Sequence, residues 1–156
     1  MPLPTDKLTN LVHESEIESQ IEYELQRARR YAWDLSFILA EPVIPDGASA
    51  DMNYPALRRL ALTAKQIMRS VDKGIRCASG VLYILPETPG DGADIALDKI
   101  RQQFAETDVP NPVTGEAIRC QIRAGRYTYQ ASGESERQGA PPAWRDVLIN
   151  LRGAME

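Results

Sequence analysis

The sequence predicts an α/β fold of the α+β type, in which a mixed β-sheet carries helices packed on it. Helical and strand-like hydrophobic patterns alternate in the order α-β-α-β-β-α-β-α, and the two adjacent strands read as a hairpin. This order is typical of ferredoxin-like palms. The chain has 156 residues, of which 43% are hydrophobic, and this suits one domain of ordinary size. We therefore expect residues 1–156 to form a single domain.

The first predicted helix follows an N-terminal extension, residues 1–12, and runs from Glu14 to Tyr31. Its start is acidic and its end is basic, which suits the helix dipole at both ends. Apolar residues spaced three or four apart lie on one helical face, formed by Ile17, Ile21, Leu25 and Ala28. The apolar run Leu35–Leu39 then predicts a strand that is buried on both faces.

The second predicted helix begins near Pro55, after a loop over residues 42–53 that is punctuated by Pro, Gly and Asp. Proline is tolerated in the first turn of a helix, because the N–H that it lacks would have no partner there. The predicted buried face of this helix comprises Leu57, Leu60, Ala61, Ala64, Ile67 and Met68.

Two β-prone segments between Ile75 and Leu85 predict a hairpin with its tight turn at Ser79 and Gly80. Glycine tolerates the positive φ that such turns demand. A third helix follows, with Asp91 or Asp94 as its N-cap. Its predicted buried face consists of Ala93, Leu97, Ile100 and Phe104.

The last predicted strand shows apolar residues at every second position, which indicates one buried face: Ile118, Cys120, Ile122 and Ala124. Residues 131–142 are polar and rich in Gly and Pro, and they predict a flexible loop. A short last helix is predicted around the apolar residues Trp144, Val147, Leu148 and Leu151.

Charge and composition argue against several classes of function, among them nucleic-acid binding and insertion into a membrane. Acidic residues outnumber basic ones 22 to 18, and the basic residues are dispersed, which argues against nucleic-acid binding. The sequence shows neither a membrane span nor a signal peptide, so we expect a cytoplasmic protein without membrane insertion. We expect His13 at the surface or as a cap, and Cys77 and Cys120 as buried thiols. With no metal-spaced cluster and no phosphate loop, we predict neither a cofactor nor a metal.

Four segments share their order and spacing with one known family. They are DKLTNL (residues 6–11), ELQRARRY followed by LSFIL, RSVDKGIR (residues 69–76), and LYILPETPGDGADIALDKIR. The first is similar to a DxLTGL motif, with Asn10 in place of glycine. Together they resemble the GGDEF domain of bacterial diguanylate cyclases. The resemblance implies that family's palm-like fold, with a sheet of about five strands.

The signature of this family is degenerate here. The resemblance places it on Ala78, Ser79, Gly80, Val81 and Leu82, or one residue earlier. Neither alignment puts a carboxylate in the motif, although active members use an acidic side chain there to help hold a metal pair. Glu41 falls near the other metal-binding position, and we interpret it as an exposed strand-end charge. The resemblance therefore implies a domain without diguanylate cyclase activity, catalytic residues or metal.

Arg69 and Asp72 keep the spacing of an RxxD motif, which in this family forms the inhibitory site for cyclic di-GMP. Residues three apart at a helix end lie on the same side. Arginine offers a fork of donors to guanine O6 and N7 or to phosphate, and aspartate accepts from guanine N1 and N2. The alternative is a local Arg–Asp pair that caps the end of the second helix.

Two functions of different classes follow from these observations. The first is a catalytically inactive regulatory module that binds cyclic di-GMP through Arg69 and Asp72. The second is a protein interaction scaffold in bacterial signalling that binds no nucleotide, acting through homodimerisation or a protein partner. A residual enzyme is the least favoured interpretation, because both halves of the metal site are lost.

Overall fold

The structure is a computed structural model that describes residues 2–131 and 141–156. Its elements, in chain order, are η1 (Glu14–Glu16), α1 (Ile17–Tyr31), β1 (Asp34–Val43), η2 (Ala50–Met52), α2 (Asn53–Ile67), β2 (Lys73–Cys77), β3 (Gly80–Leu85), α3 (Gly90–Ala105), β4 (Val109–Pro110), β5 (Ala117–Ile118), β6 (Gln121–Gln130) and α5 (Trp144–Gly153).

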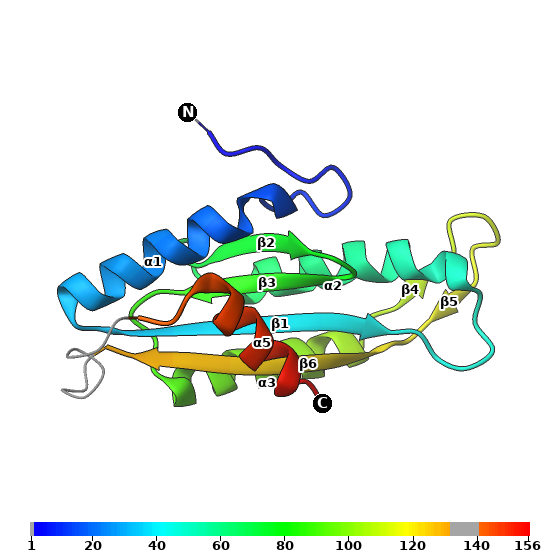
Figure 1. The fold of residues 1–156 in the computed structure, drawn as a ribbon. Coiled ribbons are helices and arrows are strands. Elements are labelled where there is room, and N and C mark those ends of the chain that lie inside the picture. Colours follow the sequence, from blue (N-terminus) through cyan, green and yellow to red (C-terminus); the bar gives the residue numbers. More distant parts are fainter. Residues whose placement is uncertain (1, 132–140) are drawn as a thin grey trace.

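A four-stranded sheet in the order β2-β3-β1-β6 forms the middle of three layers. Helices α1 and α5 cover one face, and α2 and α3 cover the other (Figure 1). The α+β fold class is thus confirmed. Two details differ from the expectation of a mixed sheet of about five strands: each pair of neighbouring strands in this sheet is antiparallel, and β4 and β5 form a separate two-stranded ribbon.

The physical reason for the separate ribbon lies in its prolines. Pro110 ends β4 and Pro112 follows shortly after, and proline cannot donate to a ladder of backbone hydrogen bonds. The segment therefore pairs only locally, with Val109 opposite Ile118. A parallel contact is present at the β2 edge instead, where Val12 pairs with Ile75.

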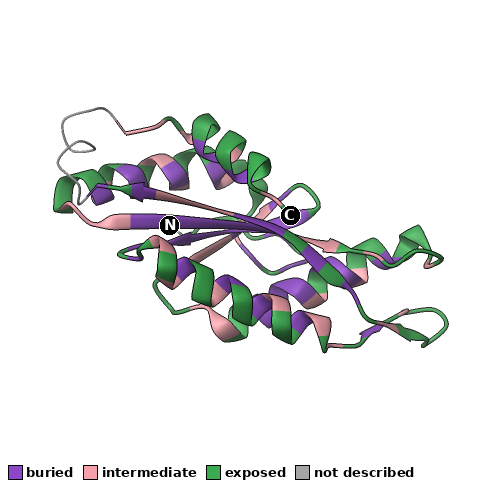
Figure 2. Cartoon of the chain, turned by 90° about the horizontal axis from the view of Figure 1, so that it is seen from below, coloured by how far each residue is buried: buried purple, intermediate pink, exposed green. Residues whose placement is uncertain are grey.

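Strand β1 is buried on both faces, as predicted. Ile38 and Ala40 pack with α2 and α3, whereas Leu35, Phe37 and Leu39 pack with α1 and α5. Figure 2 shows the buried strand between the helices of the two outer layers. Because each fully buried Leu, Ile or Phe side chain contributes about 1.5–3 kcal/mol, this strand anchors both halves of the core.

The predicted helices are present, with differences at their ends. Residues Glu14–Glu16 form a 3₁₀ turn before α1, and His13 Nδ1 accepts from Ser15 N, which confirms the expected capping role. The N-cap of α3 is Pro89 rather than Asp91 or Asp94, since the helix begins at Gly90 and both aspartates lie inside it. Asp94 pairs instead with Arg126 at 3.0 Å. The buried faces of α1, α2 and α3 are confirmed, although Ile67 and Met68 are only partly buried. In α5, Val147 and Leu151 are buried, whereas Trp144 and Leu148 are partly buried.

The two predicted loops, residues 42–53 and 131–142, differ in how they compare with the structure. The segment 42–53 is not all loop, because β1 continues to Val43 and η2 and the start of α2 lie before its end. The expected flexible loop over residues 131–142 lies largely outside the described residues. At its borders, Ala131 is buried and Pro141 and Pro142 are partly buried.

The hairpin turn is displaced by one residue from the predicted position. Ala78 and Ser79 form the turn, Ala78 has a φ of +53°, and Gly80 is already paired with Cys77 in the ladder. Gly80 is required for a different reason. A Cβ atom at this position would overlap the carbonyl oxygen of Ala40 on the neighbouring strand β1.

Candidate functional site

The turn that follows α2 brings Arg69 and Asp72 together. The helix ends at Ile67, and Met68 has extended backbone angles, so the two residues do not lie on the helix end as the sequence predicted. Asp72 N donates to Arg69 O at 3.0 Å, and this bond closes the turn. A tight turn therefore supplies the proximity that was expected from helical spacing.

Arg69 and Asp72 form a multiply hydrogen-bonded ion pair. Asp72 Oδ2 accepts from Arg69 N at 2.8 Å and from Arg69 Nε at 3.3 Å, and Oδ1 accepts from Nη2 at 2.8 Å. The Asp72 side chain is only 2% exposed. These hydrogen bonds raise the pKa of Arg69, so the guanidinium stays cationic. The local pairing that the sequence left as an alternative is thus present.

Arg69 also ties the turn to the loop between β3 and α3. Its Nη2 atom donates to Pro86 O at 3.0 Å and to Thr88 Oγ1 at 2.6 Å. The Arg69 side chain is nevertheless 52% exposed, and Nη1 has no acceptor among the residues that the structure describes. One edge of the guanidinium is therefore fixed by the protein, and the other edge is free to meet a ligand. Nothing in the sequence pointed to Pro86 or Thr88.

Two hollows meet at Arg69. One, of about 300 Å³, lies between the end of α2 and the start of α3 and is lined by Met68, Thr88 and Lys99 among others. The other, of about 410 Å³, lies on the α1 side and includes Trp33 and Lys73. Each is of the size that small-molecule sites occupy.

A buried carboxylate links α1 to this region. Glu24 is fully buried, and its Oε1 atom accepts from Arg27 Nη1 at 2.9 Å and lies 3.6 Å from Lys73 Nζ. Lys73 also donates to Gln20 Oε1 at 2.7 Å. Sequence reasoning missed Glu24, although its place on the apolar face of the helix, beside Leu25, was a usable signal.

The residues that the sequence resemblance assigns to the signature lie in the β2–β3 hairpin, where two glutamates hold the turn. Ala78 N donates to Glu14 Oε1 at 2.9 Å, and Ser79 Oγ donates to Glu41 Oε2 at 2.9 Å. The other oxygen of Glu41 lies 3.9 Å from Arg123 Nη1. The remaining signature positions, Gly80, Val81 and Leu82, are buried in β3. The turn is thus held by hydrogen bonds within the protein.

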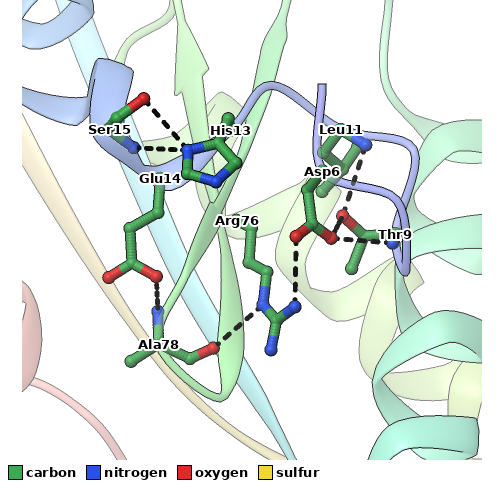
Figure 3. A network of polar contacts seen from close by, with 8 residues as sticks. All are labelled: Asp6, Thr9, Leu11, His13, Glu14, Ser15, Arg76 and Ala78. Atoms are coloured by element: carbon green, nitrogen blue, oxygen red, sulfur yellow. Dashed lines mark hydrogen bonds and ion pairs between the residues drawn. The ribbon is translucent and has the colours of Figure 1, made fainter. Parts of the chain in front are cut away.

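The N-terminal turn is connected to the same hairpin (Figure 3). Asp6 Oδ2 accepts from Thr9 N and Thr9 Oγ1 at 2.9 and 2.8 Å, and Oδ1 accepts from Arg76 Nη1 at 3.1 Å. Burial opposes the charge on Asp6, but these hydrogen bonds outweigh it and hold the pKa of Asp6 below its ordinary value. Arg76 Nε also donates to Ala78 O at 3.3 Å, which completes the connection.

The residues at the hairpin do not fit a catalytic metal pair. Within residues 2–131 and 141–156, no group of three or more His, Cys, Asp or Glu side chains is arranged to hold a metal ion. Glu41 is partly exposed and Glu14 is exposed, and both accept hydrogen bonds from the turn.

The two cysteines and the lengths of the helices can also be compared with the expectations from the sequence. Cys77 and Cys120 are free and buried, as predicted, and burial raises the pKa of both thiols, which makes them poor nucleophiles. No helix in the described part of the chain has both the length and the apolar character needed to cross a membrane.

Comparison with known proteins identifies the fold. No protein-family model and no curated protein sequence matches the chain significantly. Among solved structures, the GGDEF domain of DgcB from Caulobacter crescentus in complex with c-di-GMP is similar, with a TM-score of 0.80 and 13% identity over 99% of this chain and 88% of that domain. The FimX GGDEF domain from Pseudomonas aeruginosa has a TM-score of 0.78 and 12% identity over 96% of this chain and 90% of its own.

A third similar structure contains a protein partner. The diguanylate cyclase SiaD from Pseudomonas aeruginosa, in complex with its activator SiaC, has a TM-score of 0.71 and 19% identity. The match covers 97% of this chain and 59% of SiaD. These similarities show that the chain has a GGDEF-like fold, as the sequence resemblance implied.

Proposed function

We propose that this GGDEF-like domain is a non-catalytic receptor for cyclic di-GMP and binds it at the Arg69–Asp72 pair. The observation that carries the proposal is the state of Arg69. Four contacts to Asp72, Pro86 and Thr88 hold its guanidinium, yet the side chain is half exposed at the junction of two hollows. A charged group that is already oriented loses little conformational entropy when a ligand binds.

The two members of the pair have different roles in this proposal. Arg69 Nη1 is the available donor, and it suits guanine O6 and N7 or a phosphate oxygen. Both oxygens of Asp72 already accept from Arg69, and its side chain is almost completely buried. Asp72 therefore acts as a positioning residue, and a direct contact with guanine requires Arg69 to release it first.

The charges around the hollows are compatible with this ligand. Lys99 lines one hollow and Arg27 and Lys73 line the other, with Arg69 common to both. The carboxylates of Glu24, Asp72 and Glu87 also line these hollows, so the four cations exceed the acidic side chains by one charge, which favours an anionic ligand. The DgcB structures in complex with c-di-GMP support the choice of ligand, because that protein binds it on a similar fold.

The same proposal excludes diguanylate cyclase activity. The turn at Ala78 and Ser79 offers no carboxylate, and Glu41 is engaged with Ser79 and Arg123. Phosphoryl transfer of this kind depends on cations held between the attacking and leaving oxygens. We expect no turnover when the protein is incubated with GTP and either Mg²⁺ or Mn²⁺. Formation of a cyclic dinucleotide in that assay contradicts the non-catalytic part of the proposal.

Calorimetric titration with cyclic di-GMP tests the binding proposal. We expect the wild-type protein to bind and Arg69→Ala to lose at least about tenfold in affinity, since a charge-assisted hydrogen bond contributes about 1.5–3 kcal/mol. Arg119→Ala is a matched control, because Arg119 forms an exposed pair with Asp108 at 3.2 Å, away from Arg69. Absence of binding by the wild type, or undiminished binding by Arg69→Ala, overturns the proposal.

A protein interaction scaffold is the second candidate function. It is favoured by the SiaD structure, in which a similar domain belongs to a protein bound to its activator. In this case the protein does not bind cyclic di-GMP, and the titration described above separates the two functions. Such a scaffold can also act by forming a homodimer, and sedimentation velocity measures whether the chain self-associates.

A further inference from the structure

A second surface, away from Arg69, forms an open groove with apolar walls. It has a volume of about 600 Å³ and runs between the outer face of α2, the N-terminal turn and the β4–β5 ribbon. Its lining is formed by Leu8, Asp51, Tyr54, Pro55, Arg58, Arg59, Leu62, Pro110 and Pro112. In Figure 1 the ribbon and the loop that joins β4 to β5 lie beside the N-terminal end of α2.

Helix α2 carries exposed apolar side chains on its outer face, in addition to the face that packs on the sheet. Tyr54, Arg58 and Leu62 are spaced four apart and lie on one side of the helix. The residues at the two ends of this row are exposed, Tyr54 by 62% and Leu62 by 44%. Exposed apolar residues that are grouped in a hollow indicate a binding surface more strongly than scattered ones do.

Both walls of the groove are fixed by hydrogen bonds. The N-terminal turn that carries Leu8 is held by Asp6 and Thr9. The loop of the ribbon is held by Asn111, whose N donates to Glu116 O at 2.7 Å and whose Oδ1 accepts from Val113 N at 2.8 Å. The loop presents Val113 with 91% exposure. The groove is thus formed before any partner binds, which reduces the entropic cost of binding.

The charges beside the groove determine what it can accept. Arg58 is exposed and Arg59 is partly exposed, and neither guanidinium has a hydrogen-bond or ion-pair partner among the described residues. Asp51 is the one acidic side chain in the lining. This local excess of positive charge lies on a chain with a net charge of −4. Carboxylates are the natural partners of such unpaired arginines, because both geometry and charge match.

We infer that this groove docks a short acidic peptide segment of a partner protein, with apolar side chains at its centre. Aliphatic side chains of the segment pack against Tyr54 and Leu62 of α2 and against Pro110 and Pro112 of the ribbon. Its carboxylates pair with Arg58 and Arg59. The prolines provide no N–H groups, so the segment is held by its side chains rather than by a backbone ladder. This inference is independent of cyclic di-GMP binding, since Arg69 does not line the groove.

Chemical-shift mapping on the ¹⁵N-labelled full chain tests this inference. The probe is a capped hexapeptide of alternating glutamate and leucine, and the control peptide carries lysine in place of glutamate. We expect the acidic peptide to shift the amides of Arg58, Leu62 and Val113, and the lysine peptide to leave them unchanged. Arg58→Glu is expected to weaken binding of the acidic peptide by about tenfold or more. Lys65→Glu, an exposed position on the same helix outside the groove, is the matched control and is expected to bind like the wild type.

Three results overturn the inference. The first is equal binding of the two peptides, which indicates apolar adhesion without charge recognition. The second is evidence against these contacts, either retained affinity in Arg58→Glu or chemical shifts confined to another surface. The third is self-association of the wild type that disappears in Leu62→Asp, which identifies a second copy of the chain as the occupant. Since Arg58 and Leu62 are exposed, we expect these variants to fold, and circular dichroism confirms this before each titration.

Discussion

Arg76 on β2 donates a hydrogen bond to Asp6, 70 residues earlier in the chain, across 3.1 Å. Beside this bond, Val12 N donates to Gly74 O and Arg76 N donates to Val12 O, both at 3.0 Å. The N-terminal segment therefore covers the edge of β2 with backbone hydrogen bonds. An edge strand without such cover is a site of unwanted pairing with other chains. The predicted N-terminal extension is in this way a structural part of the sheet.

The Asp6–Arg76 bond predicts a specific acid sensitivity. The hydrogen bonds from Thr9 and Arg76 hold the pKa of Asp6 below its ordinary value, so the ionised form stabilises the fold. This contribution is fully present above the unfolded pKa of about 3.9, and it is lost as the pH falls through the lower folded value. We expect Asp6→Asn to lower the free energy of unfolding at pH 7 by about 1–2 kcal/mol.

Urea unfolding at pH 7 and at pH 3 measures this effect. The difference between wild type and Asp6→Asn is expected to be largest at pH 7 and to shrink towards pH 3, because there the unfolded wild type takes up a proton at Asp6 more readily than the folded protein does. Asp94, whose pKa is lowered by its hydrogen bond with Arg126, is present in both proteins, so its contribution cancels in the difference. Asp46→Asn, in an exposed loop, is the control. A difference that does not change with pH contradicts the assignment to Asp6.

The buried carboxylate of Glu24, on helix α1, is expected to stabilise the fold through its two ion pairs. The Glu24→Ala variant loses the bonds to Arg27 and Lys73 and leaves a small cavity. Removal of one member of a buried pair costs about 3–5 kcal/mol. Both cations are about a third exposed and keep water contacts, so we expect a smaller loss of about 2 kcal/mol in the free energy of unfolding. Chemical denaturation measures it, with exposed Glu18→Ala as the control. Equal stability of the two variants excludes the structural role.

Local patterns were sufficient to predict the helices. Ile17, Ile21, Leu25 and Ala28 were placed on one face by their spacing alone, and all four are buried. The reason is physical, because a helix that packs on a sheet must repeat its apolar residues at the helical period. The same logic located β1, since a strand covered by helices on both faces is apolar throughout.

The contacts that shape the candidate site could not be read from local patterns. The partners of Arg69 in the β3–α3 loop, Pro86 and Thr88, are 17 and 19 residues away, and no periodicity relates them to it. The turn at Ala78 was misplaced for a similar reason. Gly80 was assigned to the turn for its tolerance of positive φ, whereas it is needed beside Ala40 of a strand that is distant in sequence.

Gly80 lies so close to β1 that adding a single methyl group there is expected to destabilise the fold. In Gly80→Ala the new Cβ overlaps the Ala40 carbonyl oxygen, so two central strands must move apart. Overpacking of this kind costs about 1–3 kcal/mol, and we expect a loss of that size in the free energy of unfolding. Gly153→Ala is the matched control, because a Cβ at that position meets no atom within 4 Å apart from its chain neighbours and the backbone of its own helix. Thermal unfolding compares them, and an unchanged midpoint for Gly80→Ala contradicts the predicted clash.

In the proposed site Arg69 contacts the ligand, whereas Asp72 only orients Arg69. Variants of Asp72 can distinguish these two roles. Asp72 holds the backbone and the guanidinium of Arg69 but has almost no exposed surface. We expect Asp72→Ala to weaken cyclic di-GMP binding by about tenfold, because Arg69 must then be ordered by the ligand. Asp72→Asn is expected to retain part of the affinity, since its amide oxygen still accepts from Arg69 N.

Calorimetry with these two variants and Arg69→Ala, together with unfolding curves for each, measures both quantities. A purely structural role for Asp72 lowers stability in Asp72→Ala and leaves the affinity of the folded protein unchanged. A positioning role lowers the affinity for cyclic di-GMP even at a temperature where each variant is fully folded. The loss of affinity is then smaller in Asp72→Asn than in Asp72→Ala. Equal affinities for wild type and Asp72→Ala, with Arg69→Ala impaired, contradict positioning. In that case the contacts to Pro86 and Thr88 are sufficient to orient Arg69.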